Sequence, residues 1–479
     1  MRQDVSPVQQ PAAVPRTLGL IDLVLLKVVA IVNVNNVPPT AVFGRASLLL
    51  WVLAFVAFFI PEAVAVMVMV RRYPGEGGIY LWTRRLFGEG HGFFSGWCYW
   101  VNNLFYVPVL LLYIAGVVAF AAGERGAALI DRPWFAASVA FGWLIAMTVA
   151  NVRGLAVGKW IQNIGGIGTA LAVLLVVGAA LAVVASGGTL VPPPAAGTGW
   201  EMAAGFSVMC FAFVGIELAS TMGDEIRNPQ RDLPRAIAIS GAIAIGSYLL
   251  ITGAVQALVP VRELGPIQGI MQAVAHGASL AGIRWIVAPI AVVMALSVGG
   301  AASAWFAGSS RVPFAAGLAH ALPQALGRVH PRWGSPHVAL ITCAVLAALF
   351  TTLSFVGSTV NEAYQVLLKA SVAIQLVPFI YLFLGTMKLE GVGGLTRAAG
   401  GLGLLVTIAG TFAAFLPPAD VASVWVFELK MLAGVGGPSG VGWLLYWRTT
   451  RRARADLAVL AAAGAVPSAD APRADASVR

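Results

Sequence analysis

The sequence predicts an all-α integral membrane protein with about twelve transmembrane helices, and three observations support this fold class. Of the 479 residues, 59% are hydrophobic and only 10% are charged, and the mean hydropathy is +0.85. No soluble domain could bury that much apolar surface. A bilayer core of about 30 Å needs about 20 apolar residues per helix, and stretches of that length recur about twelve times.

The predicted spans group into two sets of five and a final pair. We expect a mobile cytoplasmic N-terminus over 1–17, a first five-helix repeat over 18–186, a second over 201–386, helices 11 and 12 over 398–447, and a disordered cytoplasmic tail over 448–479. The individual spans are 18–41, 47–70, 91–122, 133–152, 155–186, 201–222, 236–259, 282–308, 336–356, 362–386, 398–416 and 424–447.

The basic residues indicate how the chain lies in the membrane. The formal net charge is +10, and most lysines and arginines fall in alternate loops and at both ends of the chain. Cytoplasmic loops of membrane proteins carry this excess, so both termini should be cytoplasmic in a bacterial-type inner membrane. The positive charge therefore reflects topology, and we expect no nucleic-acid partner. The three cysteines lie in apolar spans without metal-ligand spacing, so we expect no metal.

Two predicted helices are interrupted at matching places in the two repeats. The first contains Asn33, Asn35 and Asn36 followed by two prolines, and the sixth places Gly215 and Glu217 at membrane depth. Proline disrupts helices, and irregular backbone inside a membrane persists only where protein or a watery cavity satisfies it. Paired interruptions of this kind mark transporter binding sites. Freed amides suit a carboxylate and freed carbonyls suit an ammonium group, so the gap fits a zwitterion.

Several motifs resemble the amino acid-polyamine-organocation (APC) superfamily of transporters. They are the loop 73–80 with Gly96-Trp97-Cys98-Tyr99-Trp100, the sixth helix and loop from 213 to 235, and the segment from 309 to 336. Weaker matches at 269–272 and 415–418 resemble the bacterial glutamate/γ-aminobutyrate antiporters.

The resemblance implies a LeuT-like inverted repeat of five plus five helices with two C-terminal helices. It implies a secondary active amino acid transporter that works by alternating access, through proton-coupled uptake or amino acid/amine exchange. Phe211 and Trp305 match positions where aromatic residues contact substrate, and Glu217 would couple the break to a proton or to gating. The predicted substrate-binding residues are Asn33, Val34, Asn35, Phe211, Phe213, Val214, Gly215, Ile216 and Trp305.

Several alternatives stay open. The family's first helix usually breaks at Gly or Ser, so the asparagines here either donate to substrate or cap the half-helices. Trp305 could be a packing residue, and Glu217 could cap its helix. Relatives carry a fifth-helix lysine where sodium-coupled cousins hold sodium. Our register puts Asn163 there, with Lys159 one turn earlier, so the coupling ion stays open.

The sequence also limits the function class. No paired catalytic carboxylates, nucleophile motif or metal-ligand set appears, so we expect no enzyme and no cofactor beyond H⁺ as a candidate coupling ion. Lys27 and Glu62 form a candidate cross-helix pair within the spans. The expected partners are an amino acid or related amine and membrane lipid, and the oligomeric state is undetermined. The alternative function is a transporter-like sensor that binds an amino acid without net transport.

Overall fold

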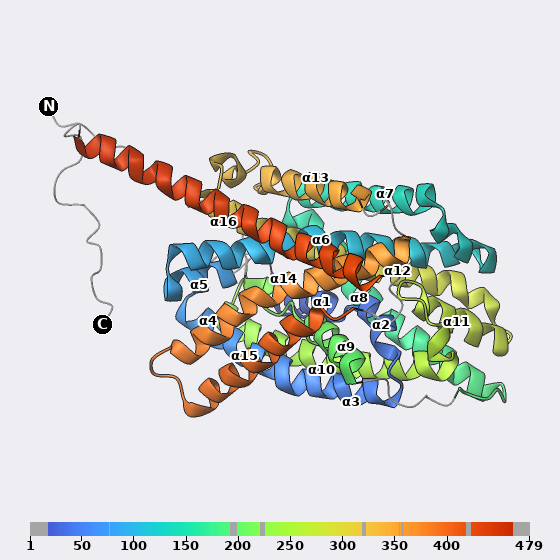
Figure 1. The fold of residues 1–479 in the computed structure, drawn as a ribbon. Helices are drawn as coiled ribbons and strands as arrows, with labels where there is room; N and C mark the ends of the chain where they lie inside the picture. The colour runs from blue at the N-terminus through green and yellow to red at the C-terminus, as the bar shows by residue number, and fades with distance from the viewer. Residues whose placement is uncertain are drawn as a thin grey trace.

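The fold is known from a computed structural model that describes residues 18–75, 77–191, 199–220, 226–318, 322–353, 355, 359–417 and 423–462 (Figure 1). The predicted N-terminal segment 1–17 lies outside these residues, as does the end of the tail from 463 onward. In the described residues, helices and their connecting loops account for the whole architecture.

The first repeat begins with a short, interrupted helix and continues with long apolar ones. Its elements are α1 (Leu20–Ile31), η1 (Val34–Asn36), α2 (Pro38–Ala41), α3 (Arg45–Ala54), η2 (Phe55–Phe59), α4 (Ile60–Arg72), α5 (Ile79–Phe87), α6 (Glu89–Ala119), η3 (Phe120–Ala122), η4 (Glu124–Asp131), α7 (Pro133–Val152) and α8 (Leu155–Ala185).

The remaining described helices begin with α9, which ends at the second interruption. Their elements are α9 (Gly199–Phe213), α10 (Pro229–Leu258), η6 (Val261–Glu263), α11 (Gly269–Leu280), η7 (Arg284–Ile286), α12 (Val287–Leu318), η8 (Gln324–Gly327), α13 (His337–Leu353), α14 (Val360–Lys388), α15 (Gly394–Ala414) and α16 (Val424–Ala462).

These elements account for the predicted number of spans. In the described part of the chain, nine helical segments are long and apolar enough to cross a membrane. The interrupted helix α1–α2, the 17-residue α13 and the less apolar α16 supply the rest. Several of these helices expose large apolar side chains such as Leu174 and Trp425, as lipid-facing helices must. The chain is therefore an integral membrane protein of about twelve helices.

The boundaries differ from the predicted ones in three places. Two short helices that we did not predict, α5 and α11, occupy loops between spans. The second span is one helix from Arg45 to Arg72, but its middle, η2, is a π-helical turn just before Pro61. Helix α16 continues to Ala462, past residue 447, where we expected the span to end, and Figure 1 shows it extending beyond the bundle.

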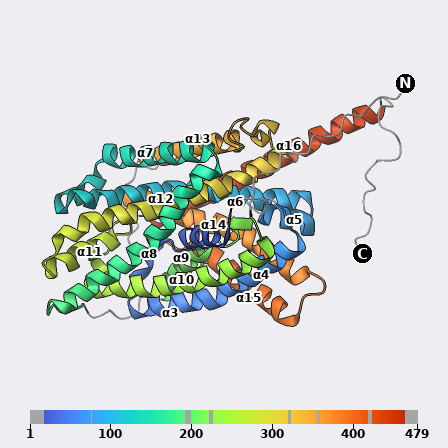
Figure 2. The ribbon, with the colours of Figure 1, turned by 180° about the vertical axis from the view of Figure 1, so that it is seen from behind.

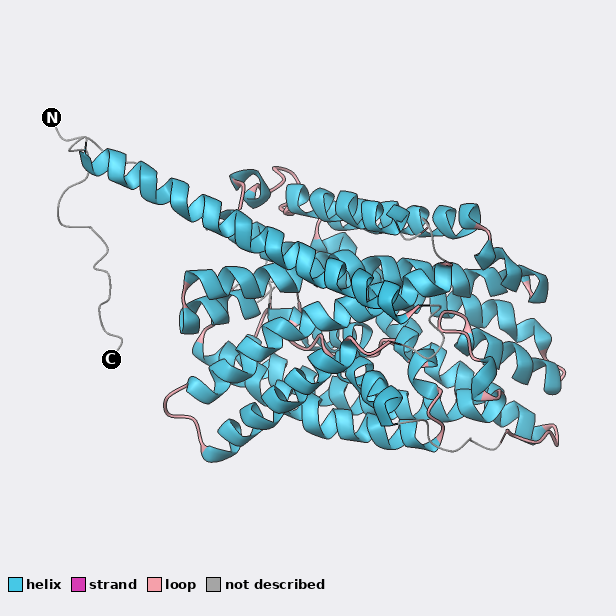
Figure 3. Ribbon diagram, in the orientation of Figure 1, coloured by secondary structure: helices cyan, strands magenta, loops and turns pink. Residues whose placement is uncertain are grey.

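Helix α1 lies at the centre of the bundle, which positions the site described next. It packs against α8, α10 and α12, and it lies inside the ring of longer helices when the molecule is viewed from either side (Figures 1 and 2). Its second half, from Leu26 to Ile31, is buried. Figure 3 shows helices and loops only, and the single strand-like contact among the described residues is an isolated bridge between Leu18 and Ile226.

Candidate functional site

The first interruption separates α1 from α2. Helix α1 ends at Ile31, Val32 and Asn33 are not helical, and a single 3-10 turn leads to Pro38. Pro38 and Pro39 lack amide hydrogens and cannot continue the hydrogen-bond ladder of α1, so the helix restarts with a proline in its first turn. This interruption confirms the prediction for the first span.

The second interruption follows α9, which ends at Phe213. Gly215 has φ +136°, a conformation that favours glycine. A Cβ atom there would lie 3.1 Å from Trp305 Cζ2 and 3.2 Å from the Ala30 carbonyl oxygen. The glycine therefore lets the backbone of the second interruption approach the end of α1.

Tyr248 on α10 joins the two interruptions. Its hydroxyl donates to the Ile31 carbonyl at 2.8 Å, with the Ala212 carbonyl 3.1 Å away as a second acceptor. The same oxygen accepts a hydrogen bond from the Asn33 amide at 2.9 Å. One buried side chain thus satisfies backbone groups that both interrupted helices leave without helical partners.

Asn33 acts in the same way. Its side-chain nitrogen donates to the carbonyls of Ala30 at 2.6 Å and Ala212 at 3.2 Å. Of the two interpretations that the sequence left open, these contacts favour capping of the half-helices for Asn33, because both donor hydrogens are engaged with backbone.

Aromatic rings cover this side of the interruption. Trp51 stacks on Tyr248 with ring centroids 3.9 Å apart, and Phe213 meets both rings edge-on. Phe213 therefore packs into this cluster, away from Phe211. We call Asn33, Trp51, Phe213 and Tyr248 the closed side of the break.

The opposite side is built from Phe211, Tyr106 and Trp305, all buried. Tyr106 on α6 meets Phe211 edge-on at 5.0 Å and Trp305 edge-on at 5.9 Å between ring centroids. The Trp305 indole nitrogen donates to the Ala30 carbonyl at 3.3 Å. The two aromatic residues predicted at the site, Phe211 and Trp305, thus both contact one tyrosine, Tyr106, that the sequence analysis did not single out.

Polar atoms without partners converge on this side. The Tyr106 hydroxyl lies beside the side chains of Asn35 and Asn36. Even so, the hydroxyl, Asn35 Oδ1 and Asn36 Nδ2 have no hydrogen-bond partner in the described part of the chain. The Asn35 carbonyl accepts a hydrogen bond from the Tyr364 hydroxyl at 2.9 Å. Buried polar groups are normally satisfied, so unpaired ones at a helix break mark a place for a polar ligand or water. We call Asn35, Asn36, Tyr106, Phe211 and Trp305 the open side.

Glu217 lies buried directly after the second interruption. One carboxylate oxygen accepts a hydrogen bond from the Tyr99 hydroxyl at 2.9 Å, and the other accepts one from the Gly215 amide at 2.8 Å. The buried Lys27 on α1 donates to the carbonyl of Ile216. The acid therefore holds the turn at Gly215 in place, as its helix-capping interpretation requires, while it also faces a buried cation.

Comparison with known proteins identifies the family. A family model described as amino acid permease matches residues 18–434. The chain belongs to the amino acid permease family. This confirms the resemblance that the motifs indicated, and it places the permease among transporters.

Similar proteins agree with this assignment. The permease is 27% identical over 443 residues to an uncharacterised transporter of Legionella pneumophila, covering 88% of this chain and 94% of the relative. It is 23% identical over 443 residues to a glutamate/gamma-aminobutyrate antiporter of Lactococcus lactis, covering 87% of each chain.

A solved structure shares the fold. The crystal structure of MhsT in complex with L-phenylalanine matches with a TM-score of 0.59 at 15% identity, covering 91% of this chain and 99% of that chain. Together with the two interrupted helices, this match confirms the predicted LeuT-like fold class.

The predicted coupling residues on α8 lie away from the break of the permease. The Asn163 side chain donates to Asp22 Oδ1 at 3.1 Å, and the other Asp22 oxygen accepts from the Gly19 amide at the start of α1. Ten residues at about 1.5 Å each separate Asp22 from Val32, so Asn163 lies about 15 Å along α1 from the break. Lys159, one turn earlier on α8, is half-buried.

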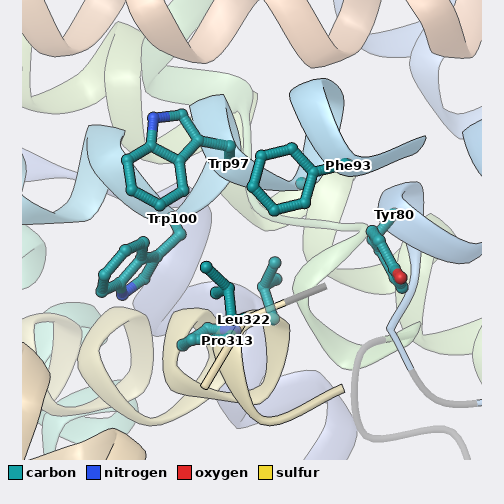
Figure 4. A pocket seen from close by; sticks show the side chains of 8 residues that line it. Tyr80, Phe93, Trp97, Trp100, Pro313 and Leu322 are labelled. Atoms are coloured by element: carbon teal, nitrogen blue, oxygen red, sulfur yellow. The ribbon is translucent and has the colours of Figure 1, made fainter. Parts of the chain in front are cut away.

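A small pocket lies away from the break, between α5, α6 and the end of α12. It is lined by aromatic and apolar side chains, among them Tyr80, Phe93, Trp97, Trp100 and Leu322 (Figure 4). Burial raises the pKa of Tyr80 above its ordinary value. The pocket contains none of the predicted site residues.

The residues that the sequence analysis missed share one feature. Tyr99, Tyr106 and Tyr248 are tyrosines inside otherwise apolar spans, and each lies in the buried core of the permease with its hydroxyl at the break. A buried tyrosine hydroxyl needs a polar partner, so tyrosines in membrane spans were a usable signal. The remaining predicted residues, Val34, Val214 and Ile216, are buried in the two interrupted segments.

Proposed function

We propose that this permease is a secondary active transporter that carries an amino acid or a related amine across a bacterial-type inner membrane by alternating access. Family membership supports the transport of amino acids. The location of the site between two interrupted helices supports alternating access, because such helices can rearrange around a fixed binding site.

The observation that carries the proposal is the set of unpaired polar atoms on the open side. Asn35 Oδ1, Asn36 Nδ2 and the Tyr106 hydroxyl lie together beside Phe211 and Trp305. An amide oxygen and an amide nitrogen offer an acceptor for an ammonium group and a donor for a carboxylate. The aromatic faces suit an apolar substrate portion or an ammonium group. These features fit a zwitterion with a small side chain or an amine.

The orientation rests on the charge distribution. Basic residues concentrate at both ends of the chain and in alternate loops, which favours cytoplasmic termini. The L. lactis relative is named as an antiporter, which supports exchange as one mode. Proton-coupled uptake is the other mode that we propose, with Glu217 within the coupling machinery.

A counterflow screen tests the proposal. Purified full-length protein in vesicles is loaded with one unlabelled amino acid or amine, and entry of the labelled compound is followed across pH, with and without sodium. We expect saturable counterflow for a subset of the panel. Tyr106→Phe should weaken the counterflow. The control Tyr381→Phe should not, because Tyr381 lies near the C-terminal end of α14 and contacts His91. Ligand binding without counterflow of any compound would favour a sensor instead.

A further inference from the structure

Three ionisable side chains from three separate segments meet in the buried interior of this transporter. Lys27 on α1, Glu62 on α4 and Glu217 after α9 are each fully buried, and they interact electrostatically with one another. Fixed charges inside a membrane are costly and occur chiefly where they pair or serve transport. Helix capping explains Glu217 in part, but neither helix capping nor the open side of the break explains Glu62.

The two carboxyl groups differ in their hydrogen bonds. Glu217 accepts hydrogen bonds on both oxygens, from the Tyr99 hydroxyl and the Gly215 amide. Among the described residues, neither Glu62 oxygen receives a hydrogen bond from an N–H or O–H group. Donors stabilise the charged form of a carboxyl group, and an unsolvated carboxylate is strongly disfavoured. Of the two carboxyl groups, Glu217 therefore has the contacts that suit a carboxylate, and Glu62 is the better place for a proton.

The Glu62 and Glu217 carboxyl groups are both fully buried and interact with each other as well as with Lys27. Two carboxyl groups can form a hydrogen bond only when one of them carries a proton. The titratable groups that face Glu62 are Lys27 from α1, Tyr99 from α6, Cys210 from α9 and Glu217. Helices α10, α14 and α15 also pack against α4, and their described residues supply none of the groups that interact with Glu62.

Lys27 balances the remaining charge. Its ammonium group donates to the Ile216 carbonyl, one residue before Glu217, so it sits at the opened end of the second interruption. With one proton on Glu62, the cluster holds one cation and one carboxylate and is neutral. Loss of that proton would leave two carboxylates against one ammonium group, a net charge of about −1 in a buried site.

We propose that Glu62 and Glu217 form a proton-binding site in which the two carboxyl groups share one proton, resident on Glu62, with Lys27 as the fixed counter-charge. The proton forms the hydrogen bond from Glu62 to Glu217, and its release places two carboxylates in contact. Their repulsion separates α4 from the second interruption, which borders the open side of the break. The proton site stands on the geometry of the three side chains, and its use in transport rests on the proposed function.

Infrared spectroscopy of the full-length protein tests the site without any substrate. At neutral pH, exposed carboxyl groups are ionised, so we expect a band from one buried protonated carboxyl group, shifted in D₂O. Glu62→Gln should remove the band, and Glu217→Gln should keep it at a shifted frequency. The control is Glu362→Gln, which should leave the band unchanged because Glu362 pairs with Lys430 away from the site. Absence of the band from the unmodified protein overturns the proposal, even if the variants fail to fold. So does a band that survives Glu62→Gln and disappears in Glu217→Gln.

Vesicle transport tests how the proton is used. Glu62→Gln imitates the protonated state, so exchange should continue while acceleration by an inward proton gradient is lost. An unchanged response to the gradient in this variant overturns the coupling role. A protein that has the infrared band but shows no counterflow of any amino acid or amine keeps the proton site and removes the transport proposal, so the two failures are distinguishable.

Discussion

Two tyrosines on opposite sides of the same helix break show how the molecule divides its polar groups between structure and binding. The Tyr248 hydroxyl contacts the Ile31 and Ala212 carbonyls and the Asn33 amide. The Tyr106 hydroxyl, equally buried, has no hydrogen-bond partner in the described part of the chain. Backbone groups freed inside a membrane must find partners, and Tyr248 and Asn33 supply them here. On the closed side the atoms without a partner among the described residues are Asn33 Oδ1 and Trp51 Nε1, whereas on the open side the Tyr106 hydroxyl, Asn35 Oδ1 and Asn36 Nδ2 lie together.

The largest effect should come from the glycine between the two sides. Gly215→Ala forces a side chain into a conformation that favours glycine and brings its Cβ within 3.1 Å of Trp305. Strain of about 1–3 kcal/mol should reduce counterflow by at least about fivefold, and by about a hundredfold at the upper end of that range. Initial rates in vesicles measure this. Gly142→Ala on α7, where a Cβ meets no atom within 4 Å, is the matched control and should keep normal rates.

Removal of the closed-side hydroxyl should mainly affect stability. Tyr248→Phe leaves the Ile31 carbonyl and the Asn33 amide without their partner, at a cost of about 1–3 kcal/mol. We expect a clearly lower unfolding temperature in detergent, with less transport because the break is no longer held. A variant as stable as the unmodified protein would show that Tyr248 does not hold the two interruptions together.

Removal of the open-side hydroxyl should affect substrate binding without lowering stability. Tyr106→Phe deletes a buried group without a partner, so the unfolding temperature should stay the same or rise slightly. Loss of one hydrogen bond to the substrate, about 1 kcal/mol, should raise the KM for counterflow about fivefold. If both tyrosine variants lower stability and neither changes KM, the distinction between the two sides fails.

The smallest effect is expected at the far end of α1. Asn163→Ala removes one hydrogen bond to Asp22, and Lys159→Met removes a half-buried charge. Because Asn163 lies about 15 Å along α1 from the break and Lys159 is one turn earlier on α8, we expect KM to be unchanged and rates to fall less than about threefold. Counterflow with and without sodium measures this. A change in ion dependence would instead support the coupling role that the family register assigns to them.

Much of the fold could be predicted because the bilayer imposes strong rules on sequence. Span length, loop charge and paired interruptions each leave a signal within one segment, and the interruptions at residues 32–37 and at Gly215 were found from prolines, amides and a glycine. Local signals failed at α5, a helix where we predicted a loop, and at α16, a helix that continues past its predicted end at residue 447.

The candidate site likewise has features that the sequence predicted and features that only the tertiary structure shows. The sequence by itself determined that a membrane transporter breaks two helices and places Glu217 beside one of them, because proline, glycine and charge act on the backbone next to them. Only the tertiary structure decided that Asn33 caps the half-helices, that Tyr248 holds the closed side and Tyr106 faces the open side, and that Lys27 and Glu62 meet Glu217. Those pairings join residues far apart in the chain, and no local pattern records which helices will pack together.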